Sequence, residues 1–159
     1  MKKLILCFLS IMLVVNISGC VKQEDPVEND LREYIQNIEA VFSMEESVNE
    51  HFASVSGDNH INPETSYDVL INDIIPKMNN VRTAAGNINP STPTVRNLHR
   101  IYEQYLNDKY LSLLSFSEGL LPVDTSKLHS AVESMVRANE KRQEYLDGID
   151  DLFYEYFQD

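Results

Sequence analysis

The sequence predicts an all-α protein, an up-down-up-down four-helix bundle with a kinked second helix. Apolar residues recur at spacings of three and four along four long segments, as expected for amphipathic helices. Glycine and proline are sparse, with five and six residues among 159, which argues against a loop-rich all-β domain. Short connections between amphipathic helices favour antiparallel neighbours and therefore a bundle.

The first helix is expected from about Asp25 to Val55. Asp25 suits the cap position, Pro26 the first helical position, and Glu28 follows the cap by three residues. The helix should end at residues 56–59, SGDN. Its apolar stripe comprises Leu31, Ile35, Ile38, Val41, Phe42, Val48, Phe52 and Val55.

The second helix should begin at Asn62-Pro63 and end at Gly86-Asn87, a typical C-terminal signal. Pro76 falls inside it and should kink it, because proline lacks one backbone donor and clashes with the preceding turn. The apolar stripe comprises Tyr67, Leu70, Ile71, Ile74, Ile75, Met78, Val81 and Ala85.

The third helix should follow residues 91–93 and close at Gly119 and Pro122, and the fourth should open near Asp124 or Thr125. The stripe of the third comprises Val95, Leu98, Ile101, Tyr102, Tyr105, Leu106, Leu113, Leu114 and Phe116. The stripe of the fourth comprises Leu128, Val132, Met135, Val136, Leu146, Ile149, Leu152 and Phe153. Tyr102, Tyr105 and Tyr110 are expected in the core with hydroxyls reaching water or a partner, the alternative being a groove.

The N-terminus has the pattern of a secretory signal. Lys2 and Lys3 precede a nearly unbroken apolar run over residues 4–15, which is shorter than the roughly 20 residues that a membrane-spanning helix needs. The predicted organisation is a removed signal peptide over 1–19, a tether over 20–27 and a helical domain over 28–159.

The end of this signal, Ile17-Ser18-Gly19-Cys20, resembles the lipobox of bacterial lipoproteins. The resemblance implies that a diacylglyceryl group is attached to Cys20 and that a lipoprotein signal peptidase cleaves before it. The expected location is the outer leaflet of the cell membrane, or the outer membrane of a Gram-negative host, because Val21 rather than Asp follows the cysteine.

Charge and cysteine usage exclude several functions. The net charge is −12, and removal of residues 1–19, which carry Lys2 and Lys3 but no acid, makes it −14. Clustered Lys and Arg are needed for nucleic-acid binding, so no nucleic-acid partner is expected. With Cys7 removed and Cys20 lipidated, no thiol is left for a disulfide, a zinc–thiolate site or a nucleophile.

No recognisable catalytic motif is present, so we expect a non-catalytic protein without a cofactor. His99 and His129 each precede a glutamate by four residues, Glu103 and Glu133, but they should lie roughly 20 Å apart along the bundle. His51 and His129, near the end distal to the membrane, are weak candidates for a metal site.

The histidine in the adjoining loop, His60, and the carboxylates of Glu50 or Glu133 would assist such a site. The more ordinary interpretation is that His51 and His129 are surface or boundary residues.

The C-terminal aromatics Phe153, Tyr154, Tyr156 and Phe157 either pack on the start of the first helix or form a partner surface near the bilayer. In addition, residues 74–76, 88–93 and 98–102 resemble a pattern in small uncharacterised helical lipoproteins, which implies no mechanism. We therefore expect a lipid-anchored module that binds an envelope protein or cell-wall component. The alternatives are an immunity or inhibitor lipoprotein against an envelope-acting toxin or hydrolase, and a metal-binding bundle.

Overall fold

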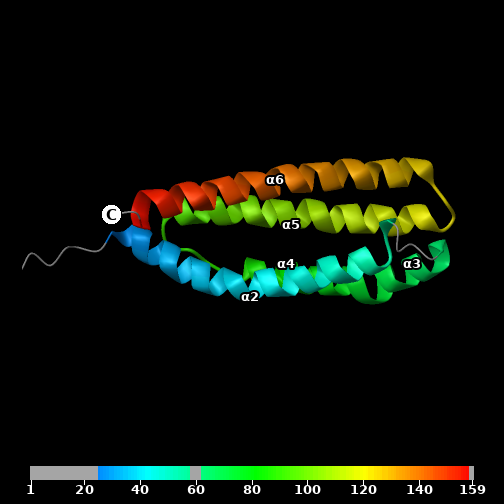
Figure 1. The fold of residues 1–159 in the computed structure, drawn as a ribbon, viewed down its shortest axis with the longest axis horizontal. Coiled ribbons are helices and arrows are strands. Elements are labelled where there is room, and N and C mark those ends of the chain that lie inside the picture. Colours follow the sequence, from blue (N-terminus) through cyan, green and yellow to red (C-terminus); the bar gives the residue numbers. More distant parts are fainter. Residues whose placement is uncertain (1–24, 58–61, 158–159) are drawn as a thin grey trace, which may run out of the picture.

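A computed structural model describes residues 25–57 and 62–157 of the chain. Helices account for nearly all of these residues, and the described ranges contain no strand, so the predicted all-α class is confirmed. The helical segments are α2 (Pro26–Ser54), α3 (Pro63–Val69), η2 (Leu70–Ile74), α4 (Ile75–Gly86), α5 (Pro93–Leu120) and α6 (Thr125–Phe157). They lie along the long axis of the molecule, and the first turn of α2 lies at the same end as the last turn of α6 (Figure 1).

The predicted helix starts are confirmed by their caps. The side chains of Asp25, Asn62 and Thr92 accept hydrogen bonds from backbone N–H groups of the first turn, and proline follows each of them. The carboxylate of Glu28, in the first turn, accepts a hydrogen bond from Arg32 at 2.8 Å.

The start of α5 is also fixed from another helix. Asp30 of α2 accepts hydrogen bonds from the N–H groups of Ser91 and Thr92, both at 2.8 Å, and from the Thr92 hydroxyl at 2.6 Å. Burial raises the pKa of Asp30, but these bonds outweigh it and hold the pKa below its usual value. A buried carboxylate at the positive end of α5 therefore joins the two helices.

The residues before Pro76 form the π-helical segment η2. There the N–H of Ile75 donates to the carbonyl of Leu70, five residues back. A wider turn is one way in which a helix accommodates a proline that cannot donate to the preceding turn. The kink at Pro76 itself stays a prediction.

Helix α6 packs mainly on α5, and it does so through small side chains. Ala131, Ser134 and Ala138 of α6 are buried, and Ser112 of α5 donates its hydroxyl to the carbonyl of Ala131 at 2.7 Å. Small residues let two helix backbones approach closely, so they occupy the seam in place of the larger apolar residues expected there.

The stripe predicted for the fourth helix is accordingly wrong in part. Val132 is 61% exposed and Val136 is 51% exposed, although both were expected in the core. The stripe of the second helix also contains one error, because Ile71 lies at the surface. The buried face of α6 is therefore rotated from the face that apolar content alone predicts, whereas the other residues of the second stripe are buried or partly buried.

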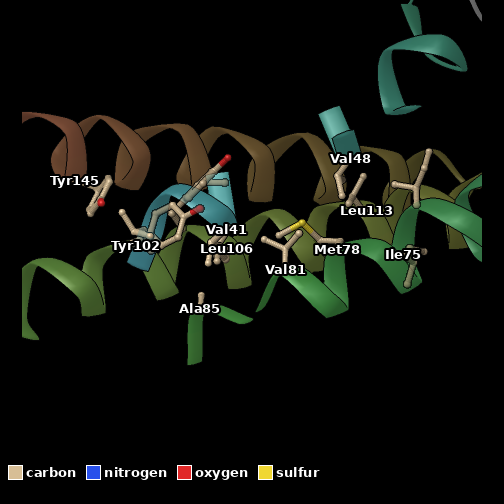
Figure 2. Packing of buried hydrophobic residues seen from close by; sticks show 14 of the residues in the cluster. Val41, Val48, Ile75, Met78, Val81, Ala85, Tyr102, Leu106, Leu113 and Tyr145 are labelled. Carbon is tan, nitrogen blue, oxygen red and sulfur yellow. The ribbon is translucent and has the colours of Figure 1, made fainter. Parts of the chain in front are cut away.

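The core lies between the helices and extends along their length. Figure 2 shows part of it, with Val41 and Val48 of α2, Met78 and Val81 of α4, and Leu106 of α5 turned toward the interior. Tyr34, Tyr102 and Tyr145 are among its largest fully buried side chains. The described part of the chain holds no helix long and apolar enough to cross a membrane.

Candidate functional site

A cluster of polar side chains lies buried between α2 and α5. The carboxylate of Glu45 and the ammonium of Lys109 are 2.5 Å apart, and each side chain is only 8% exposed. Lys109 also donates to Asn49 Oδ1 at 2.6 Å and to the Tyr105 hydroxyl at 2.9 Å, so all three of its N–H donors are used. The hydroxyls of Tyr102 and Tyr105 donate to the two carboxylate oxygens of Glu45.

These contacts keep Glu45 ionised. Burial alone would raise the pKa of its carboxyl, but the charge of Lys109 and the donated hydrogen bonds outweigh it and lower the pKa. Burial also lowers the pKa of Lys109, while Glu45 acts in the opposite direction. With every ammonium donor facing an acceptor, the cluster is a satisfied ion pair inside the core.

A pocket of about 310 Å³ opens beside this cluster, between α2, α5 and α6. Its apolar walls are the side chains of Val48, Phe52, Leu113 and Met135. Val48 and Leu113 lie close together in the core in Figure 2. The pocket exists because α2 makes few contacts with α6, whereas α5 and α6 pack closely.

The polar lining of the pocket is cationic. It includes Lys109, the amides of Asn49 and Asn139, and the exposed guanidinium of Arg142. Arg142 interacts with the Tyr105 hydroxyl. It forms no ion pair with any residue that the structure describes. Because Glu45 already neutralises Lys109, the pocket carries about one uncompensated positive charge.

A second buried group consists of Tyr34, Tyr145 and His99. The Tyr34 hydroxyl donates to the Tyr145 hydroxyl at 3.2 Å, and His99 Nδ1 lies 3.3 Å from the Tyr34 oxygen. His99 Nε2 is buried and lies 3.9 Å from Glu103 Oε1, and the ring also interacts with the backbone of Ala85. Burial therefore lowers the pKa of His99, and the ring is neutral at pH 7.

The two histidines considered for a metal site have different partners. His51 Nδ1 lies 2.9 Å from Asp73 and 2.7 Å from the ammonium of Lys77, whereas His129 is largely exposed and lies 3.3 Å from Glu133. Within residues 25–57 and 62–157, no three His, Cys, Asp or Glu side chains are placed to hold a metal ion. His60, which the hypothesis includes, lies outside the described residues.

Some of the C-terminal aromatics pack on the start of α2, and others are exposed as a partner surface would require. Phe157 is partly buried, with the guanidinium of Arg32 4.5 Å from its ring centroid, so the last turn does pack on the start of α2. Tyr156 is also partly buried. In contrast, Phe153 is 50% exposed and Tyr154 is 69% exposed. Those two side chains are available to a partner.

The predicted signal peptide and the lipobox residues Ile17, Ser18, Gly19 and Cys20 lie outside the described residues. Of the predicted tether, residues 25–27 already form the cap and first turn of α2.

Sequence reasoning missed Glu45, Lys109 and Arg142. The signal for the first two was present: Glu45 lies between Val41 and Val48 at stripe spacing, and Lys109 lies between Leu106 and Leu113. One acid and one base that each occupy a core position on different helices indicate a buried pair.

Comparisons of the chain with protein-family models, with curated proteins and with solved structures find no match.

Proposed function

We propose that this chain is a bacterial lipoprotein whose helical domain is a non-catalytic binding module for another protein of the cell envelope. Residues 1–19 would be removed, and Cys20 would carry the lipid. The lipobox resemblance supports this part of the proposal. Two acyl chains provide firm anchoring, at about 0.8 kcal/mol for each buried methylene.

We further propose the up-down-up-down arrangement, with the kink of the second helix at Pro76. Short connections over residues 87–92 and 121–124 support it, since such connections favour antiparallel neighbours. An even number of helices returns the C-terminus to the anchored end.

The observation that carries the proposal is the exposed aromatic pair Phe153 and Tyr154 at the end of the domain where α2 begins. Five residues separate Cys20 from Pro26, so the distance between these two residues is at most about 22 Å when the segment is fully extended. The aromatic pair would therefore be held close to the bilayer surface, where a neighbouring membrane protein is within reach.

The chemistry of this surface favours a protein partner. Large aromatic side chains are enriched at the centres of protein interfaces and contribute most of the binding energy there. The exposed acids Asp150, Asp151 and Glu155 surround the pair and would repel anionic lipid headgroups. The partner expected here has an apolar depression with a basic rim.

Site-specific photo-crosslinking in intact cells tests the proposal. A photoreactive residue at position 154 should capture one envelope protein, identified by mass spectrometry. The matched control is position 140, where Glu140 is exposed on the same side of α6 about four turns away. Equal capture at both positions, or capture of lipid alone at position 154, would exclude this surface as the binding site.

A Cys20→Ser variant tests the anchoring. It should accumulate as an uncleaved precursor that incorporates no labelled fatty acid. Normal cleavage and acylation of this variant would show that the chain is not a lipoprotein.

A further inference from the structure

We infer that the pocket between α2, α5 and α6 binds a small amphipathic monoanion, such as a carboxylate with an apolar chain. This site is separate from the aromatic surface proposed above. Arg142 and Phe153 are eleven residues apart on α6, which corresponds to about 16 Å along the helix.

The charge of the ligand follows from the lining. Residues three and four positions from Arg142 on α6 are Ala138, Asn139, Tyr145 and Leu146, so no acid on its own helix can neutralise it. Glu45 is the acid of the adjacent cluster, and both of its oxygens already accept bonds from Lys109 and the two tyrosines. In a chain with a net charge of −12, a cation left unpaired beside a pocket fits one anionic group.

The orientation of the ligand follows from the available donors. Asn49 uses its carbonyl oxygen to accept from Lys109, so its NH₂ group is left as a donor. Together with the guanidinium of Arg142, this amide can bind a carboxylate at the polar side of the pocket. Lys109 is saturated and contributes its charge, not a further hydrogen bond.

The size and apolar part of the ligand follow from the walls. The apolar walls can contact a hydrocarbon chain but carry no hydrogen-bonding side-chain group for a polar tail. They are formed by Val48, Phe52, Leu113 and Met135. The volume of 310 Å³ lies at the lower end of the range for ligand pockets. At about 30 Å³ for each water-sized group, it holds about ten such groups, which matches octanoate in size.

The probe is octanoate carrying ¹³C at its carboxyl carbon, added to the processed lipoprotein in phosphatidylcholine nanodiscs and followed by NMR. Empty nanodiscs correct for partitioning into lipid. Octanoate should bind saturably and at least about tenfold more tightly than octanol, because the alcohol cannot pair with Arg142. Octyltrimethylammonium should not compete.

Variants assign the binding to this pocket. Arg142→Met keeps the apolar stem of an exposed side chain and should weaken octanoate binding about tenfold, whereas Arg142→Lys should retain part of it. Arg137→Met is the matched control, because Arg137 is exposed on the same helix, bonds Ser134 and does not line the pocket. Met135→Trp should block the pocket without altering its charge.

No saturable octanoate binding at millimolar concentration would overturn the inference. Unchanged binding to Arg142→Met or to Met135→Trp would do the same. Far-UV circular dichroism of each variant establishes that it is folded.

Discussion

Replacing Lys109 with methionine should lower the free energy of unfolding by about 3–5 kcal/mol at pH 7. Methionine keeps most of the apolar stem but removes the charge that neutralises Glu45. The carboxylate then stays buried with only the two tyrosine hydroxyls as donors. Asn49 also loses the partner of its carbonyl oxygen. The cost exceeds that of an exposed ion pair, about 0–1 kcal/mol, because both side chains are only 8% exposed.

The pH dependence of this loss has a defined sign. In the variant, burial without Lys109 raises the pKa of Glu45 above its usual value of 4.5, so protonation stabilises the folded state as the pH falls through that raised pKa. In the wild type the pKa is lowered, so the contribution of Glu45 is present above pH 4.5 and is lost as the pH falls below it. The difference between the two proteins should therefore shrink on acidification.

Urea unfolding followed by far-UV circular dichroism measures these energies for Lys109→Met, Glu45→Gln and the double variant. The double variant should lose clearly less than the sum of the two single losses, because it leaves no unpaired charge. A loss below about 1 kcal/mol for Lys109→Met, or strict additivity in the double variant, would refute the reasoning.

Substitutions at three other places in the fold give further predictions. His99→Gln should make the melting temperature fall less steeply below pH 6.5 than it does in the wild type. Burial holds the pKa of His99 below 6.5 in the folded protein, so the unfolded chain takes up the proton first. A decline as steep as that of the wild type would contradict this. Asp30→Ala should cost about 2–3 kcal/mol in urea unfolding by removing the acceptor at the start of α5, and a loss within about 0.5 kcal/mol would count against that role. Gly119→Ala should lower the free energy of unfolding by about 1–3 kcal/mol, because the added Cβ would lie 2.9 Å from Leu128 Cδ2. Gly86→Ala should raise it by up to about 1 kcal/mol, because its Cβ would meet nothing closer than 3.9 Å. Thermal melts that reverse this order would refute the packing argument.

Helix ends were predictable because they depend on local chemistry. Asp25, Asn62 and Thr92 each satisfy N–H groups within three residues, and the proline after each cap has its torsion preset for the first turn. Such signals are contained in a few consecutive residues, so no knowledge of the other helices was needed. The four predicted segments correspond to α2, to α3 with η2 and α4, to α5 and to α6.

The buried face of α6 was not predictable from the same information. Apolar periodicity favours Val132 and Val136, but the close approach of α5 places Ala131, Ser134 and Ala138 in the seam. Which face is buried depends on the distance to the neighbouring helix, and a sequence pattern does not contain that distance.

The candidate pocket was missed for a related reason. A search for core residues that accepts only apolar side chains assigns Glu45 and Lys109 to the solvent-exposed surface. Their spacing nevertheless places each of them in the apolar stripe of its helix. Their burial is tolerable only because each finds the other across helices, 64 residues apart in sequence. The sequence likewise does not show that Arg142 lacks an acidic partner, because this depends on which residues of the neighbouring helices lie beside it.

The small-residue seam between α5 and α6 bears on the order in which the chain assembles. Ser112 and Ala131 are 19 residues apart, whereas Glu45 meets Tyr102 across 57 residues, and closing a shorter loop costs less entropy. We therefore expect the α5–α6 hairpin to form before α2 docks on it, and α2 can meet the nearby α4 earlier still. Synthesis begins at the N-terminus, so the helix that is made first completes its packing last. Until the hairpin exists, α4 and η2 can cover one part of α2, but the part that carries Glu45 and faces α5 stays open to solvent.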